Sequence, residues 1–171
     1  PERINEKAIR AAQVKPVDEK ALEDFKALLK KYNVEISALS CHGNPVHPNK
    51  EIAKSFDDDL RKAVLLAEKL GVHQINTFSG CPGDSETSKN PNWVTCSWPN
   101  DYLEILDWQW NEVLIPYWKK EAQFAKEHGV KIATENMWNY NTTNWTIIDA
   151  ACSNEKSFVI NLFVSVCCSR M

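Results

Sequence analysis

The sequence predicts an α/β fold in which parallel strands alternate with amphipathic helices. Three stretches indicate this, because each ends a charged helix with Asn or Gly and then enters a run led by Val: LLKKYNVEISA, LAEKLGVHQINT and FAKEHGVKIAT. Asn or Gly suits the left-handed residue that closes a helix, and the apolar run suits a buried parallel strand. Their alternation predicts βαβ units. We therefore expect strands near residues 34–40, 72–79 and 130–135, and a weaker fourth near 158–163.

Four helical stretches are expected around these strands. Asp18 is placed to cap the first, and the fourth lies near residues 145–152. The third runs from about residue 101 to 128, where Pro116 should break or kink it. Apolar residues at helical spacing line one face of the first helix and, in part, one face of the second. These residues are Leu22, Phe25, Leu28 and Leu29 in the first helix, and Ile52, Phe56, Leu60, Val64 and Leu70 in the second.

Length and composition limit the class of protein. The 171 residues, 43% of them apolar, suffice for one domain over residues 1–171. A net charge of −3 without a basic run argues against a nucleic-acid partner. No stretch approaches the roughly 20 apolar residues that span a bilayer, so no membrane partner is expected. The six cysteines contain no C-x-x-C pair, which favours reduced thiols and a cytoplasmic protein.

Polar side chains follow the predicted strands, where parallel α/β folds bind their ligands. His42 and Asn44 follow the first strand, Cys81 follows the second, and Glu135 ends the third. A strand-end carboxylate can bind Mg²⁺ or Mn²⁺ or act as a general base, and an imidazole can bind a sugar hydroxyl or move a proton. His42 could equally be an ordinary turn residue. Glu135 is harder to explain structurally, because burying an unpaired carboxylate is costly.

The connection from Gly80 to Asn100 is longer than ordinary βα loops, which is typical of functional loops. It carries Trp93 and Trp98, whose rings could stack on a sugar or close a pocket. The alternative is that both rings pack against tryptophans of the following helix, and the sequence does not decide between the two.

Four long strings in the chain resemble one known family. They are VEISALSCHGNPVHP, NTFSGCPGDS, PNWVTCSWP and DWQWNEVLIPYWKKEAQFAKEHGVKIATE, and they are similar to strings in sugar phosphate isomerase/epimerases with the xylose isomerase-like barrel. The well-matched core is residues 18–135, followed by a divergent tail over residues 136–171. The resemblance implies a partial (β/α)₈ TIM barrel with about four parallel strands and helices on the outer side.

The family resemblance also implies a chemistry. Its members bind a divalent cation (Mn, Mg, Co or Zn) and move protons on a carbonyl-bearing sugar or polyol. Glu135 falls on the first of four metal ligands and would be catalytic, and His42 falls on a histidine of the substrate pocket. The remaining expected substrate contacts are Asn44, Cys81, Trp93 and Trp98, with a small sugar or sugar phosphate as partner.

The chain departs from the family after Glu135. Asn136, Met137 and Trp138 stand where the family has Met-His-Pro, and INLFVS keeps Asn161 but lacks the Asp ligand of NFDPSH. With the strands of the last two ligands also missing, we expect this chain alone to hold little or no metal and to have little or no activity. Whether the ends are natural or reflect a truncated or frameshifted reading frame stays open.

Two other functions are considered. One is a non-catalytic sugar-binding or interaction module, which could form a homodimer through open barrel edges. The other is a metal-dependent phosphodiesterase of the endonuclease IV type, which shares the barrel. That activity needs several His and carboxylate ligands and a basic face, and the sequence offers neither.

Overall fold

The computed structural model describes residues 18–135 of the chain. The predicted helix near 145–152, the predicted strand near 158–163 and the divergent tail lie outside these residues. The elements, in chain order, are α2 (Glu19–Tyr32), β1 (Leu39–Ser40), α3 (Lys50–Leu70), β2 (Gln74–Phe78), α4 (Asp101–Trp108), the π-helical turn η1 (Gln109–Leu114), α5 (Ile115–Glu127) and β3 (Lys131–Glu135).

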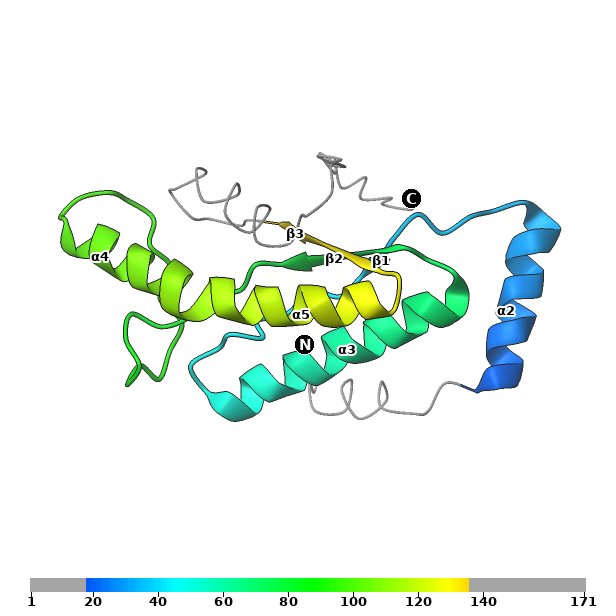
Figure 1. Cartoon of the computed structure of the whole chain (residues 1–171), viewed down its shortest axis with the longest axis horizontal. Coiled ribbons are helices and arrows are strands. Elements are labelled where there is room, and N and C mark those ends of the chain that lie inside the picture. The colour runs from blue at the N-terminus through cyan, green and yellow to red at the C-terminus, as the bar shows by residue number, and fades with distance from the viewer. Residues whose placement is uncertain (1–17, 136–171) are drawn as a thin grey trace, which may run out of the picture.

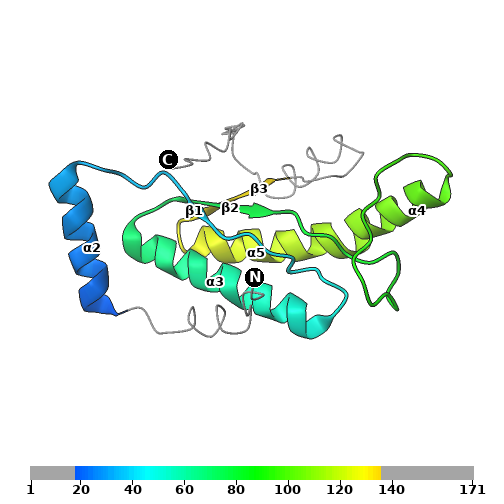
Figure 2. The same cartoon turned by 180° about the vertical axis from the view of Figure 1, so that it is seen from behind.

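The described strands form one parallel sheet in the order β1-β2-β3. Ile75 of β2 lies between Leu39 of β1 and Ile132 of β3 in the ladder. Helices α3 and α5 run along one face of this sheet (Figure 1), and the reverse view shows the same arrangement (Figure 2). Ile75 is fully buried in the core between sheet and helices. The predicted α/β class with parallel strands is confirmed.

The predicted helix ends are also confirmed. Asn33, Gly71 and Gly129 adopt left-handed backbone conformations with φ of 50°, 74° and 69° after their helices. Asp18 caps α2, where its carboxylate accepts a hydrogen bond from the amide of Lys20 at 3.0 Å. These features depend on local chemistry, so the sequence alone was enough to predict them.

The first predicted strand is much shorter than expected. Only Leu39 and Ser40 pair with β2, whereas the sequence predicts a strand over residues 34–40. In this register Glu35 would lie beside Gly71, at the turn that ends α3, so the ladder cannot extend back to residue 34. Residues 34–38 form no ladder with β2.

The predicted apolar face of α2 is present but only partly buried, with Leu29 half-buried. Leu22 is buried, but Phe25 and Leu28 are 42% and 49% exposed. In both views α2 stands at the end of the molecule, apart from the layer that α3 and α5 form (Figures 1 and 2). Over most of its length, the apolar face of α2 therefore packs against nothing among residues 18–135.

Pro116 neither breaks the third helix into separate pieces nor leaves it regular. The helix changes to π-helical spacing over Gln109–Leu114, and the amide of Ile115 bonds to the carbonyl of Trp110, five residues back. Proline cannot donate a backbone hydrogen bond and its ring crowds the preceding turn. A wider turn before Pro116 accommodates both effects, and α5 continues to Glu127.

A polar network joins α3 to α5 across their contact. Arg61 donates to Glu121 at 2.7 Å, and the Glu121 side chain is only 1% exposed. Tyr117 donates its hydroxyl hydrogen to Asp57 at 2.8 Å, and burial together with this bond raises the pKa of the Tyr117 phenol. The network fixes how the two helices sit against each other and hence against the sheet.

Candidate substrate pocket at the strand ends

Three side chains form a row where the strands end. Phe78 of β2 pairs with Glu135 of β3, and the register of β1 continued by two residues places His42 on the other side of Phe78. The rings of His42 and Phe78 stack with centroids 4.2 Å apart and planes inclined by 26°. Partners in a parallel ladder point to the same face. The row therefore lies on the face opposite Ile75 and the helices, and both His42 and Glu135 are exposed there.

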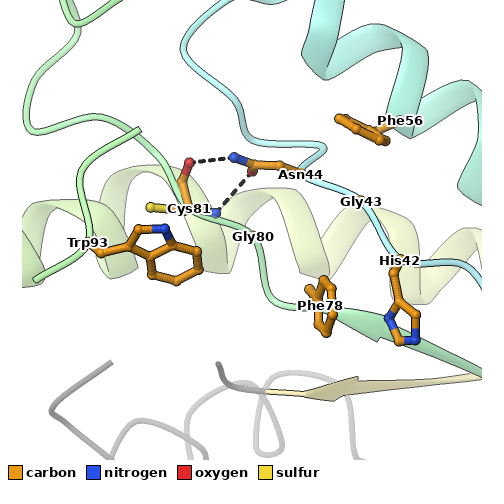
Figure 3. A pocket seen from close by; sticks show the side chains of 8 residues that line it. All are labelled: His42, Gly43, Asn44, Phe56, Phe78, Gly80, Cys81 and Trp93. Carbon is orange, nitrogen blue, oxygen red and sulfur yellow. Dashed lines mark hydrogen bonds between the residues drawn. The ribbon is translucent and has the colours of Figure 1, made fainter. Parts of the chain in front are cut away.

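A pocket of about 390 Å³ lies next to this row. Figure 3 shows its walls, which come from the ends of β1 and β2, from α3 and from the loop after β2. Most of the lining is aromatic or bare backbone, with His42 and Asn44 as the polar side chains. The lining residues are His42, Gly43, Asn44, Phe56, Phe78, Gly80, Cys81 and Trp93.

Asn44 ties the two strand-end loops together. Its amide nitrogen donates to the carbonyl of Cys81 at 2.8 Å, and its amide oxygen accepts from the backbone N–H of the same residue at 3.0 Å (Figure 3). Gly80 makes this approach possible, because its φ is +90° and a Cβ there would lie 2.6 Å from Val46. The Asn44 amide is thus committed to the protein backbone and forms part of the pocket wall.

The cysteines near the pocket are poor nucleophiles. Cys81 is 3% exposed, and burial raises the pKa of its thiol to about 12. Burial raises the pKa of Cys41 too, and the negative charge of Asp59 adds to this shift. A thiol reacts and ligates as the thiolate. Cys81 therefore contributes shape to the pocket at neutral pH. Cys41, Cys81 and Cys96 are all unpaired thiols.

The long loop brings one of its two tryptophans to the pocket. Trp93 lines the pocket with 42% of its surface exposed, while Trp98 is 80% exposed and lies outside the lining. The glycine-containing turn earlier in the loop is closed on itself, because the Ser88 hydroxyl accepts from the amides of Asp84 and Ser85 at 3.1 and 3.0 Å. The Ser88 hydroxyl in turn donates to the Asp84 carboxylate. Together with a bond from the Ser85 hydroxyl, this bond lowers the pKa of the Asp84 carboxyl.

The structure brings four of the predicted site residues to one pocket: His42, Asn44, Cys81 and Trp93. Glu135 lies one strand away, beside Phe78. The sequence did not identify Phe56 and Phe78 as pocket residues, since an apolar residue on a predicted helix or strand is normally assigned to the hydrophobic core. The signal that could have found the Phe56 wall is Gly43, where a Cβ would lie 2.4 Å from the Phe56 ring.

The described residues do not by themselves form a metal centre. Between residues 18 and 135, no three His, Cys, Asp or Glu side chains are grouped so that they could hold one ion. Glu135 can supply one carboxylate, and divalent cations such as Mg²⁺ and Ca²⁺ need several oxygen ligands to compete with water. The other ligands of such a cage would come from outside the described residues.

Comparison with known proteins agrees with this architecture. Residues 4–157 match the family described as xylose isomerase-like TIM barrel. The chain is also 44% identical over 117 residues to the Bacillus subtilis (strain 168) protein named Uncharacterized protein YfiH. That stretch is 67% of this chain and 37% of the relative, so the chain spans little more than a third of the relative's length. No helix within residues 18–135 is both long and apolar enough to cross a membrane. With its parallel strands and outer helices, the chain belongs to the family of xylose isomerase-like TIM barrels.

Proposed function

We propose that the strand-end pocket binds a sugar or sugar phosphate, and that the chain is part of an isomerase or epimerase that moves a proton next to a carbonyl group. The observation that carries this proposal is the row of His42, Phe78 and Glu135 beside an aromatic pocket. Sugars present C–H groups to aromatic rings and hydroxyl groups to polar side chains. A pocket with both kinds of wall suits them.

The row and the neighbouring loop have distinct roles in the proposal. His42 donates to or accepts from a sugar hydroxyl, and its stacking on Phe78 holds the imidazole in one orientation. Glu135 supplies one carboxylate ligand to a divalent metal, which when bound would polarise the substrate carbonyl. Trp93 closes the side of the pocket away from His42.

A second candidate is a sugar-binding module without catalysis. The observation that favours it is the lack of a three-ligand cluster within residues 18–135. A phosphodiesterase that acts on DNA is less well supported, because it needs both such a cluster and a basic surface, and the chain has a net charge of −3.

The test measures metal, binding and turnover on the full chain. Native mass spectrometry with and without Mn²⁺ detects metal binding and the association of two copies. NMR in D₂O reads proton exchange next to the carbonyl of D-xylose, D-fructose and D-fructose 6-phosphate. We expect saturable sugar binding by the chain. Because Glu135 alone holds a metal poorly, we expect Mn²⁺-dependent exchange only where two copies associate and hold Mn²⁺, and this exchange should be abolished by Glu135→Gln and retained by the exposed-site control Glu104→Gln.

Each of the other outcomes points elsewhere. Saturable binding without exchange supports the binding module instead of the isomerase. Gly43→Leu tests the pocket itself, because a Cβ at this position would lie 2.4 Å from the Phe56 ring and must displace that wall. If sugar affinity is the same in Gly43→Leu and the parent protein, the ligand binds elsewhere and the proposed site is wrong.

A further inference from the structure

The loop after β2 is closed at its base by one buried side chain. Gln109 is 1% exposed, and its amide nitrogen donates to the carbonyls of Gly83 at 2.9 Å and Asn92 at 2.8 Å. Both hydrogens of this amide are therefore used on two separate points of the loop. A third bond, from the amide of Asn92 to the carbonyl of Pro82 at 2.8 Å, closes the same base.

Gln109 occupies an unusual place in its helix. It is the first residue of the π-helical turn, and it faces the loop while its neighbours Trp110 and Leu114 lie in the core. Short π-helical turns are rare and occur frequently at functional sites. Burying a side-chain amide costs free energy unless its polar groups are hydrogen-bonded, and here the loop carbonyls of Gly83 and Asn92 accept from the amide nitrogen.

The residue after Asn92 is the pocket tryptophan. Asn92 is held by Gln109, and Val94 on the other side is 1% exposed in the hydrophobic core. Trp93 is thus anchored at both neighbours, while its own ring remains 42% exposed at the pocket. This combination fixes the backbone of Trp93 and leaves the ring free to meet a ligand.

We propose that Gln109 is a positioning residue that sets the Trp93 ring at the pocket and thereby sets the affinity for a ligand that stacks on it. The part that concerns the ligand rests on the proposed sugar-binding function. The part that concerns Trp93 does not, and it can be tested without any ligand.

The ligand-free test uses ¹⁹F NMR of the full chain labelled with 5-fluorotryptophan. Loss of one signal in Trp93→Phe assigns the Trp93 resonance, and the exposed Trp98 serves as internal reference. Gln109→Met keeps the length of the side chain and removes both donated bonds. Asn111→Met is the matched control, because Asn111 lies exposed in the same turn and bonds only locally, to Asp107 at 2.9 Å.

We expect Gln109→Met to shift the Trp93 resonance and to increase its broadening by a soluble paramagnetic agent, while Asn111→Met and the Trp98 resonance stay as in the parent protein. Should Gln109→Met not fold, Gln109→Asn keeps a donor on a side chain shorter by one methylene and should shift Trp93 in the same direction by less. An unchanged Trp93 signal in a folded variant overturns the proposal.

The ligand test is a double-mutant cycle with D-fructose 6-phosphate as the probe. If Gln109 acts through Trp93, Gln109→Met weakens binding by about tenfold in the parent protein and adds nothing in a Trp93→Leu background. Equal weakening in both backgrounds means that Gln109 acts on the fold in general, which overturns the proposal. If the parent protein does not bind the probe, the proposed function fails, while the ¹⁹F result still decides the role of Gln109.

Discussion

One substitution at Asn44 tests a single hydrogen bond of the pocket, the one from its side-chain amide to the carbonyl of Cys81. Asn44→Asp preserves the size of the side chain and the oxygen that accepts from the Cys81 amide at 3.0 Å. It replaces the N–H₂ group, which donates to the Cys81 carbonyl at 2.8 Å, with a carboxylate oxygen. The lost bond costs about 1 kcal/mol, and the unpaired carbonyl of a residue that is 3% exposed costs about 1–2 kcal/mol more. We expect the free energy of unfolding to fall by about 2–3 kcal/mol at neutral pH.

The same variant should show a diagnostic pH dependence. Burial and the facing carbonyl disfavour the charged form, so folding raises the pKa of the introduced carboxyl above its unfolded value of about 3.9. The folded state then binds more protons than the unfolded state, and stability falls as the pH rises through the folded pKa. On acidification the protonated carboxyl can donate to the Cys81 carbonyl again. The difference in stability from the parent protein should therefore shrink as the pH is lowered.

Urea unfolding followed by circular dichroism, at several pH values, measures this difference. Asn49→Asp is the matched control, because the Asn49 side chain caps α3 by accepting from the amides of Glu51 and Ile52 and, unlike Asn44, donates to no group among the described residues. Asp caps helices as well as Asn, so this control should unfold like the parent protein. If Asn44→Asp and Asn49→Asp unfold at the same urea concentration, the bridge to Cys81 does not hold the loops together.

Three further predictions concern other parts of the chain. Arg61→Met leaves the buried Glu121 carboxylate without its partner at 2.7 Å, and we expect the free energy of unfolding in urea to fall by about 3 kcal/mol. The double variant Arg61→Met/Glu121→Met should recover most of this loss, because it leaves no unpaired buried charge. Gly71→Ala should lower the thermal midpoint through about 1 kcal/mol of backbone strain alone, because φ is +74° and the added Cβ would have no atom within 4 Å. Gly71→Asn should lower it less, because Asn tolerates the left-handed conformation better. Iodoacetamide at neutral pH should alkylate the exposed Cys96 well before Cys81, with mass spectrometry of the peptides as the measurement; equal rates would contradict the raised pKa of Cys81.

The features that the sequence predicted correctly are those set by neighbouring residues. The ends of α2 and α3 follow from Asn33 and Gly71, which accept a left-handed conformation at little cost. The strands β2 and β3 follow from apolar runs that begin just after such ends. Each of these needs only a few residues of context, and for that reason the order and direction of the elements could be predicted.

The errors arose where an outcome depends on a distant partner. The strand predicted over residues 34–40 pairs with β2 only at Leu39 and Ser40, and the extent of that pairing depends on β2, about 35 residues further along the chain. The apolar face of α2 could not be assigned to solvent from its own pattern. Phe56 packs closely on Gly43, in the loop after β1, and this contact between a helix and a separate loop makes Phe56 a pocket wall.

The site itself depends on side-chain amides that take the place of strand pairing. Beyond the last ladder residue of a parallel strand, the backbone groups of the loops lose their regular partners, and buried groups of this kind must be satisfied some other way. Asn44 does this for Cys81, and Gln109 does it for Gly83 and Asn92. A carboxamide suits the task because it carries a donor and an acceptor like the peptide group and has no charge to desolvate. Such residues leave no periodic signal in a sequence, yet they decide where the walls of the pocket stand. In this chain the half-buried Asn44 and the buried Gln109 therefore act together with Gly43 and Gly80 to shape the site.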